Sequence, residues 1–324
     1  INELGAVQLL NIPSISAGIV ENWVIEGNPS GAIGLALIAL IIVTSLVAYE
    51  KALRRRSRRW TEGVAGGEAP AWHLKGIRAV LAQCLTLIPP VFTLGTPIFW
   101  AVINIDQLGK GLNLDLLLIT LRSLALGLAA AFFAVIAALF LAIAKRWNPA
   151  NWMKSLTFLA GIGYAIPGVV LALALQSFSS PPWKLAPITL LLWGYSDRFL
   201  AVAKGGFDAA LERVSPSLDE AATGLGCQWP EVLKKIHLPL LKGPIAVGGL
   251  LVFVDTLKEL PLTFVLRPFD YDTLSVRIFQ YASDERMVES ILPALIILIL
   301  GLIASMALVP KLDHRNGASK YEQK

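Results

Sequence analysis

Long apolar runs dominate this chain and leave few folds open to it. A helix needs about 20 apolar residues to cross the hydrocarbon core of a membrane. Seven stretches are candidates, at about 31–49, 79–104, 116–144, 155–177, 187–204, 243–262 and 290–310. Charged residues make up 16% of the chain, below the roughly 25% of soluble domains. Because backbone groups in lipid must be satisfied within their own segment, the sequence predicts an all-α integral membrane protein, a polytopic bundle of about seven transmembrane helices.

Basic residues are distributed unevenly over the segments between these runs. If residues 50–78 lie in the cytoplasm and the chain alternates from there, the inside segments hold 21 of the 28 Lys and Arg residues and the outside segments hold 7. Basic residues accumulate on the cytoplasmic side of membrane proteins, so we expect the loop before 243 and the C-terminus to be cytoplasmic. The arginines within 54–59 are typical of a membrane-surface anchor, with a nucleic-acid patch as the alternative. The net charge of +5 therefore requires no nucleic-acid partner.

A polar segment, residues 215–239, interrupts the apolar pattern. Ser215-Pro216-Ser217 is a good helix start, and Gly226 is suited to end that helix. Pro230 can begin a second short helix, which we expect Pro239 to break before the next apolar run. The segment therefore predicts a helix–turn–helix with a small-residue side, suited to docking in a groove on another protein. A plain amphipathic loop at the membrane surface is the alternative.

The same segment resembles the coupling loop (EAA motif) of ABC importer permeases. In that family the loop docks on the ATP-binding subunit. The resemblance implies a type I importer permease fold in a bacterial inner (plasma) membrane. The partners it implies are a cytoplasmic ABC ATPase dimer and a periplasmic or extracellular binding protein. The ATPase-coupling residues expected from it are Glu220, Ala221, Ala222, Gly226, Ile236, Leu238 and Pro239.

The sequence contains no phosphate-binding loop of the G-x-x-x-x-G-K-[ST] type. Its one Gly-Lys pair, Gly109-Lys110, lacks the earlier glycine and is followed by Gly111. We therefore expect a transporter permease and not an enzyme, with no catalytic residue and no bound cofactor. ATP and Mg would be used by the partner ATPase.

Most of the chain is similar to the permeases of ferric-iron importers with two fused halves. The residues that carry this similarity lie at 5–10, 163–168, 215–222, 254–261, 266–269, 272–274 and 282–286. The resemblance implies Fe(III) as the transported ion and a ferric-iron-binding protein as a partner. A permease for thiamine, a polyamine or an oxyanion is the alternative within this family. An ion-coupled secondary carrier and an intramembrane enzyme are the alternatives from other classes.

A weak internal repeat suggests the domain organisation. Glu3-Leu4 and Glu259-Leu260 each begin a mixed polar stretch that leads into an apolar helix and a basic tail. This pattern predicts an upstream permease half with its own coupling loop, and the first residue, Ile1 in place of Met, agrees with it. The expected parts are the tail of a preceding repeat with its last transmembrane helix (1–50), a basic and Gly-rich cytoplasmic linker (51–73), a six-helix permease domain with its coupling loop (74–310), and a cytoplasmic tail (311–324).

Charged residues near the end of the sixth run are candidates for the substrate pathway. Asp255, Lys258 and Glu259 have i, i+3, i+4 spacing, so a continuous helix would carry them on one face. Charge within a span is costly and usually faces a cavity or a partner, and carboxylate oxygens suit a hard cation. The pathway candidates are therefore Glu3, Tyr164, Asp255, Lys258 and Glu259, with Glu3 and Glu259 as candidate iron ligands. The alternative is a structural ion pair of Lys258 with Asp255 or Glu259.

The remaining charged residues fall into two groups. We expect Asp197 and Arg198 to form a structural pair at the cytoplasmic end of a span. An outside segment holds the candidates for docking a binding protein, which a solvated loop would explain equally well: Arg267, Asp270, Asp284, Glu285 and Arg286.

Overall fold

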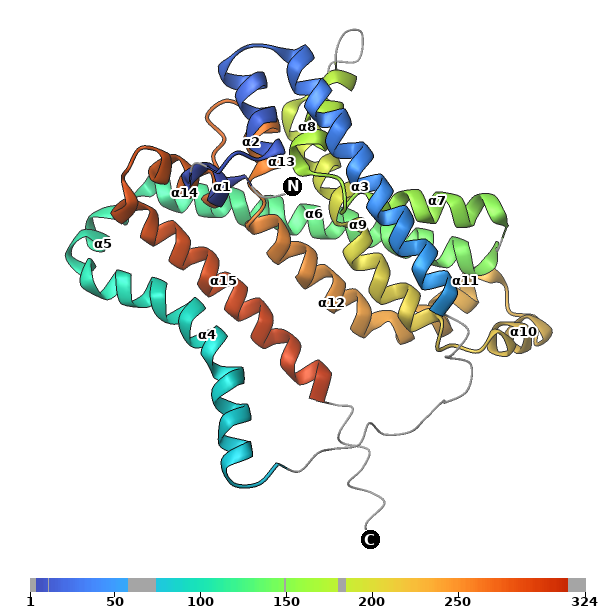
Figure 1. The fold of residues 1–324 in the computed structure, drawn as a ribbon. Coiled ribbons are helices and arrows are strands. Elements are labelled where there is room, and N and C mark those ends of the chain that lie inside the picture. Colours follow the sequence, from blue (N-terminus) through green and yellow to red (C-terminus); the bar gives the residue numbers. More distant parts are fainter. Residues whose placement is uncertain (1–3, 11, 58–73, 149, 180–184, 314–324) are drawn as a thin grey trace.

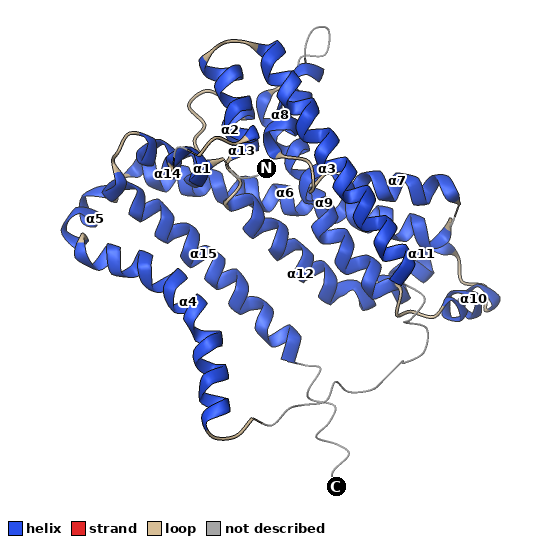
Figure 2. Cartoon of the chain, in the orientation of Figure 1, coloured by secondary structure: helices blue, strands red, loops and turns tan. Residues whose placement is uncertain are grey.

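Every regular element in the part of the chain that the structure describes is helical (Figures 1 and 2). The computed structural model describes residues 4–10, 12–57, 74–148, 150–179 and 185–313. Within these ranges no strand occurs, so the predicted all-α fold is confirmed. The predicted linker at 51–73 and the tail at 311–324 lie largely outside the described residues.

Within the described ranges, most successive helices are joined by short connections. Their bounds are α1 Gly5–Leu9, α2 Ile15–Val20, the π-helical turn η1 Glu21–Ile25, α3 Pro29–Ser57, α4 Ile77–Ile103, α5 Ile105–Gly111, α6 Leu114–Trp147, α7 Asn151–Ile162, α8 Gly168–Phe178, α9 Pro187–Leu211, α10 Pro216–Gly224, α11 Trp229–Val232, the π-helical turn η3 Leu233–His237, α12 Leu238–Leu257, α13 Pro261–Leu266, α14 Leu274–Ser283 and α15 Met287–Asp313.

Five helical stretches among the described residues are long and apolar enough to cross a membrane, at Pro29–Glu50, Ile77–Ile103, Leu114–Trp147, Trp229–Leu257 and Met287–Ala307. The predicted count of about seven is thus approximate. The run at 155–177 is not one helix but two, α7 and α8, because Pro167 has no N–H to donate and disfavours helical backbone in the residue before it. The run at 187–204 forms α9, which carries Asp197, Arg198 and Lys204.

Two further expectations about helix ends were wrong. Pro239 does not break the helix before the sixth run, because it lies in the first turn of α12, which continues directly from η3. The wider turn of η3 changes the local hydrogen-bond pattern, which accommodates a proline in a continuing helix. The sixth run itself ends early, at Leu257, and Pro261 begins the separate helix α13.

The core lies where α6, α9 and α12 pack against one another, with α8 and α13 beside them. The face of α6 in this core consists of alanines, and Ala130, Ala134 and Ala138 are fully buried at four-residue spacing. Gly248 of α12 lies against Ala203 of α9, where an added Cβ would come within 3.2 Å of the Ala203 Cα. Small residues of this kind let helix backbones approach closely in membranes. We call the contact of α6 with α9 and α12, made by Ala130, Ala134, Ala138, Ala203 and Gly248, the small-residue seam.

The segment before the linker packs on the other side of α8. Ile19 of α2 and Ala36 of α3 are buried with Val169 and Leu173 of α8 in a second apolar cluster. The order of a short helix, a helix of six to ten residues and a long apolar helix occurs here as α1, α2 and α3, and again as α13, α14 and α15. Corresponding helices begin 256 to 259 residues apart, which agrees with the sequence repeat.

The outer parts of the molecule define its two ends (Figure 1). Helices α10 and α11 lie at one end of the bundle, here called the α10 end. Helices α5 and α14 lie at the other end, here called the α14 end. Helix α4 contacts α15 and otherwise lies apart from the bundle. Nearly all of its apolar surface is exposed.

Candidate functional site

The polar segment 215–239 forms the predicted helix–turn–helix. Ser215 caps α10 by accepting a hydrogen bond from the Ser217 backbone N–H, and Pro216 occupies the first turn. Gly226 follows with a φ of +85°, a left-handed conformation that suits glycine after a helix end. The Cys227 N–H then closes the turn on the Ala222 carbonyl, 3.0 Å away.

The predicted coupling residues divide between two sides of this segment. Glu220, Ala221 and Gly226 are exposed, whereas Ala222 is buried and Ile236 and Leu238 are partly buried toward the bundle. Apolar side chains accompany the exposed residues: Leu218, Leu225 and Trp229, of which Leu225 is 86% exposed. Clustered exposed apolar residues with a polar rim are typical of a protein contact surface. We call the exposed side of α10 and its turn the α10 face.

Sequence reasoning missed the residues that hold α10 to the bundle. Arg146, in the last turn of α6, donates from Nε to the Asp219 carboxylate at 2.7 Å. The buried His237 of η3 lies 3.2 Å from the other oxygen of that carboxylate. A single arginine after an apolar run is typical of any cytoplasmic span end, and a lone histidine has no ligand spacing. Asp219 has a purely local explanation, because a carboxylate in the first turn of a helix is stabilised by the helix dipole.

A second group of polar residues lies at two helix breaks. The break between α7 and α8 (163–167) and the break between α12 and α13 (258–260) are joined by Arg198 of α9. Its Nη1 donates to the Ile166 carbonyl at 2.6 Å, and its Nε lies 3.3 Å from Oε2 of Glu259. Arg198 is 2% exposed and Glu259 is 8% exposed. The pair therefore neutralises two charges that burial away from water would otherwise make costly.

The surroundings of Glu259 are built to hold it. Its Oε1 accepts the Leu262 N–H at the start of α13, and its backbone carbonyl accepts the hydroxyls of Thr263 and Ser275. Gly168 at the start of α8 leaves room for the carboxylate, since an added Cβ there would lie 2.7 Å from Oε1. Helices α8, α9, α13 and α14 therefore meet around Glu259. We call Glu259 and its contacts with Arg198, Leu262, Thr263 and Ser275 the polar node.

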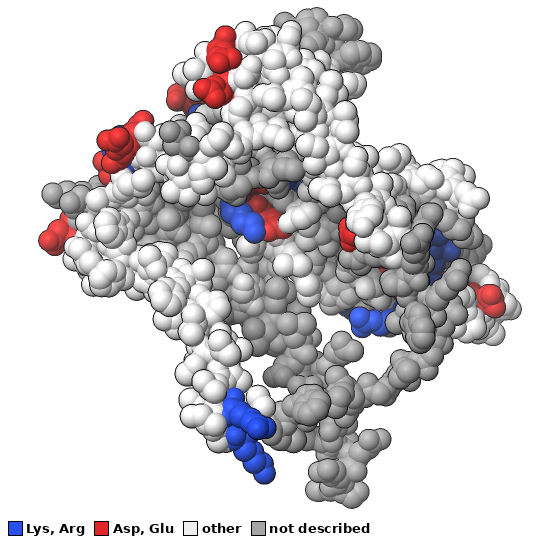
Figure 3. Space-filling view, in the orientation of Figure 1, with Lys and Arg blue, Asp and Glu red and all other residues white. Residues whose placement is uncertain are grey.

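Asp255, Lys258 and Glu259 do not share a helix face. Helix α12 ends at Leu257, so Glu259 turns into the bundle toward Arg198 while Lys258 pairs with Asp255 at 2.9 Å. The Lys258 side chain is 64% exposed, and Tyr164 is also exposed. Figure 3 shows basic and acidic atoms side by side in the hollowed middle of one face of the molecule.

Two earlier expectations change with this geometry. Lys258 forms the ion pair that was given as the alternative to a pathway role, and its partner is Asp255 and not Glu259. The ion-pair partner of Arg198 is Glu259 and not Asp197, and Arg198 lies near the middle of α9 instead of at a span end. The predicted pairing of Glu3 with Glu259 cannot be placed, because Glu3 lies outside the described residues. Within them, no group of three or more His, Cys, Asp or Glu side chains could hold a metal ion.

The residues predicted to dock a binding protein lie at the α14 end. Arg267 is paired with Asp272 and Arg286 with Glu289, so both arginines have partners within the chain. The remaining candidates, all exposed, are Asp270, Asp284 and Glu285. Asp270 and Glu285 have positive φ values of 60° and 61° in tight turns, and the neighbouring Phe269 is almost completely exposed.

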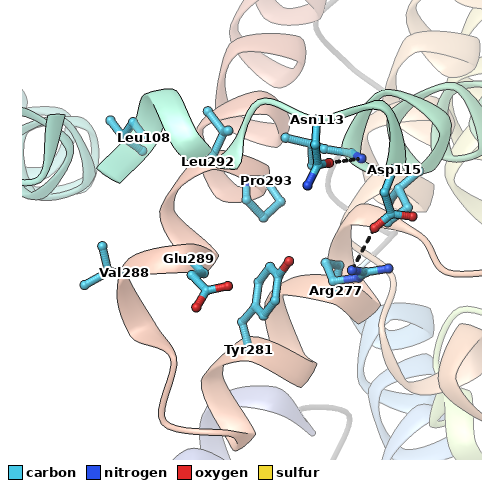
Figure 4. A pocket seen from close by; sticks show the side chains of 12 residues that line it. Leu108, Asn113, Asp115, Arg277, Tyr281, Val288, Glu289, Leu292 and Pro293 are labelled. Atoms are coloured by element: carbon cyan, nitrogen blue, oxygen red, sulfur yellow. Dashed lines mark hydrogen bonds and ion pairs between the residues drawn. The ribbon is translucent and has the colours of Figure 1, made fainter. Parts of the chain in front are cut away.

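A pocket of about 330 Å³ opens at the same end between α5, α6, α14 and α15 (Figure 4). The Arg277 guanidinium lies 3.0 Å from the Asp115 carboxylate at its edge. Tyr281 and Glu289 line the pocket from α14 and α15. Charges of both signs are thus already paired around it.

The comparison with protein families decides the class of the molecule. Residues 130–317 match the model of the family described as binding-protein-dependent transport system inner membrane component. The chain belongs to this family. The matched range contains both the α10 face and the polar node. The predicted ABC importer permease family is therefore confirmed, and with it a membrane subunit of a transport system in place of an enzyme.

The individual relatives are named for different cargoes. The chain is 26% identical over 295 residues to "Fe(3+)-transport system permease protein FbpB 2" of Haemophilus influenzae, which covers 87% of this chain and 57% of that protein. It is also 26% identical over 191 residues to "Putative 2-aminoethylphosphonate transport system permease protein PhnV" of Salmonella paratyphi A, covering 58% of this chain and 72% of that protein. The chain thus spans little more than half the length of FbpB 2.

Solved structures agree on the fold. A chain of the bacterial alginate ABC transporter in complex with its alginate-bound periplasmic protein superposes with a TM-score of 0.55 at 15% identity, covering 73% of this chain and 94% of that chain. A second structure of an alginate-importing ABC transporter gives a TM-score of 0.54 at 16% identity, covering 76% and 96%. These likenesses establish the importer permease fold.

Proposed function

We propose that this chain is the ATP-driven permease of a ferric-iron importer, powered by a separate ABC ATPase dimer that uses ATP and Mg. The observation that carries the iron assignment is the similarity to FbpB 2 over 87% of the chain. A permease for 2-aminoethylphosphonate is the second candidate, because PhnV aligns over 58% of the chain. Thiamine, a polyamine or an ion-coupled mechanism has no such support.

The α10 face is the proposed contact with the ATPase, and the α10 end and the C-terminus are proposed to be cytoplasmic. Its exposed Leu225 and Glu220 stand at the tip of the bundle, and none of the described helices covers them. Gly226 allows the tight turn, while Ala222, Ile236, Leu238 and Pro239 connect the face to α12. Glu220→Lys and Gly226→Asp are therefore expected to abolish co-purification of the ATPase. Normal co-purification and transport in both variants would contradict this assignment.

The proposed substrate pathway passes the exposed side of the two helix breaks. Tyr164 and the Asp255–Lys258 pair provide phenol, carboxylate and ammonium groups there. Carboxylate and phenolate oxygens suit Fe(III) as cargo. Glu259 lies directly behind this surface. By the repeat, Glu3 is proposed as its counterpart, and both remain the proposed iron ligands along the route.

The exposed turns at the α14 end are the proposed contact with a periplasmic or extracellular ferric-iron-binding protein. Asp270, Asp284 and Glu285 are exposed and can contact a partner. Arg267 and Arg286 lie in the same region and are paired within the chain. We also propose that the complete importer contains an upstream permease half with its own coupling loop. The recurrence of α1–α3 as α13–α15 supports this proposal.

Cargo is tested by stimulation of the ATPase. The complete complex in proteoliposomes receives the cognate binding protein loaded with Fe(III) or, in parallel, with 2-aminoethylphosphonate. We expect stimulation only by the Fe(III)-loaded protein. Stimulation only by the phosphonate would replace iron with the second candidate. The apo binding protein serves as the control for stimulation without cargo.

A further inference from the structure

The last turn of α6 binds the chain around the start of α10 with one side chain. Nη1 of Arg146 donates to the carbonyl oxygens of Leu211 at 2.8 Å and Val214 at 3.1 Å. Its Nη2 donates to Val214 at 3.1 Å and Ser215 at 3.3 Å, and Nε donates to Asp219. One guanidinium therefore holds the end of α9, the connection after it and the first turn of α10.

Asp219 extends this contact to the start of α12. Its Oδ1 lies 3.2 Å from Nε2 of the buried His237 in η3. The Trp147 ring, next to Arg146, packs on the rings of Trp229 and His237 with centroids 4.2 and 6.0 Å apart. Helices α6, α10, α11 and the start of α12 thus meet in one cluster. We call Arg146, Trp147, Asp219 and His237 the α6 anchor.

The charged part of the α6 anchor lies behind the α10 face, and Trp229 contacts both. The side chains of Arg146 and Asp219 are only 14% and 20% exposed, because they lie between α10 and the bundle. Glu220 and Leu225 lie on the exposed side. The covalent connection from α9 to α10, residues 212–215, is not helical, so α9 and α10 do not form one continuous rod. The charge-assisted hydrogen bonds of Arg146 therefore connect α10 directly to α6, whereas the chain after α10 leads through α11 and η3 into α12.

The opposite end of α6 holds the α14 end. Ser123 accepts the Leu274 N–H at the start of α14, 2.8 Å away, and Arg122 donates to the Asp270 carbonyl at 2.8 Å. Between Arg122 and Arg146 the helix is unbroken and about 36 Å long at 1.5 Å per residue. This stretch carries the alanines of the small-residue seam. One rigid element therefore touches both the α10 segment and the turn at Asp270.

We propose that α6 is the mechanical link between the two ends of the permease, and that Arg146 is the positioning residue through which α10 moves it. This inference rests on the proposed docking of an ATPase on the α10 face. Guanidinium is the group the geometry requires, because its fixed fork reaches four acceptors at once, whereas a lysine ammonium has three donors on one atom.

The test is Arg146→Ala in the complete transporter reconstituted with its ATPase. The probe is the cognate binding protein carrying whichever cargo stimulates the wild-type complex. We expect the ATPase to co-purify in wild-type proportion and its basal rate to stay within about twofold. Stimulation by the binding protein and transport should fall at least tenfold, about 1.4 kcal/mol of lost coupling. Arg146→Lys should recover only part of the stimulation.

Lys145→Ala is the matched control. Lys145 is the neighbouring cation, and its ion pair, at 3.4 Å, is with Asp208 of α9 instead of Asp219 of α10. It should keep normal stimulation. Asp219→Asn keeps the side-chain shape and should lose stimulation in the same direction as Arg146→Ala, which decides the matter if Arg146→Ala does not fold. Normal stimulation in a folded Arg146→Ala complex would overturn the inference. Loss of ATPase binding, as expected of Glu220→Lys, would place Arg146 in the docking contact instead.

Discussion

Glu259 stabilises the fold and is also a proposed residue of the substrate pathway. Its carboxylate neutralises Arg198, accepts an N–H from α13 and fills the space left by Gly168. Removal of one partner of a buried ion pair leaves an uncompensated charge, which costs about 3–5 kcal/mol. The carboxylate can therefore enter the pathway only in a conformation that gives Arg198 another acceptor.

Glu259→Gln removes the charge and keeps the shape of the side chain. We expect the complex to assemble with its ATPase, to unfold several degrees below the wild type, and to take up Fe(III) at least tenfold more slowly. Thermal unfolding and uptake in proteoliposomes measure the two effects. An Arg198→Leu, Glu259→Leu double variant should recover part of the stability, because a buried pair can be replaced by apolar residues at little cost, while the Ile166 carbonyl and the Leu262 N–H lose their partners. Wild-type uptake in Glu259→Gln would exclude Glu259 from the route.

Gly168 provides a second test at the same node. An added Cβ would lie 2.7 Å from the Glu259 carboxylate, so Gly168→Ala forces the carboxylate away from its position. We expect a loss of about 1–3 kcal/mol, the usual cost of overpacking, and a matching fall in uptake. Gly205→Ala in α9 is the control, because a Cβ there meets nothing within 4 Å. Equal effects of both variants would mean that helix propensity, and not the node, decides the result.

At the scale of helices, the close contact of α6 with α9 and α12 depends on small side chains. Ala134 is fully buried in the small-residue seam, so Ala134→Leu should separate the helices and cost about 1–3 kcal/mol. Ala48→Leu on the exposed side of α3 is the matched control and should change the unfolding temperature little. If both variants unfold at the wild-type temperature, the seam does not determine the packing.

The sequence predicted the helices far better than the points where they break. Apolar runs are long and local, so their positions are visible directly, and Pro167 could have indicated the break before α8. Pro261 is a similar signal for the bend of the chain at Lys258–Leu260, but Glu259 continues the spacing of a helix and the bend was therefore not predicted. Its true partner, Arg198, is 61 residues away in the chain, as is typical of contacts that only folding reveals. Arg146 was missed for the same reason, since it binds the chain 65 to 73 residues further on.

At the scale of the whole molecule, the two ends differ in what they expose. The α10 end presents apolar side chains around Leu225, and the α14 end presents acidic turns at Asp270 and Glu285. Helix α6 runs between them and contacts both. An importer needs an energy-coupled end and a cargo-receiving end on opposite sides of the membrane. The proposed functions of the two ends therefore depend on the orientation of the bundle in the membrane.

The cysteines allow that orientation to be measured. Cys227 lies in the turn after α10 and Cys84 lies on the exposed α4, and neither forms a disulfide. In a Cys84→Ser background, a membrane-impermeant maleimide should label Cys227 in inside-out vesicles stripped of peripheral proteins. It should leave Cys227 unlabelled in intact spheroplasts, because the α10 end then faces the cytoplasm. Asp284→Cys in a background without both native cysteines should give the reverse result. Labelling of Cys227 from outside intact spheroplasts would mean that the bundle has the opposite orientation in the membrane. The α10 face could then have no access to a cytoplasmic ATPase.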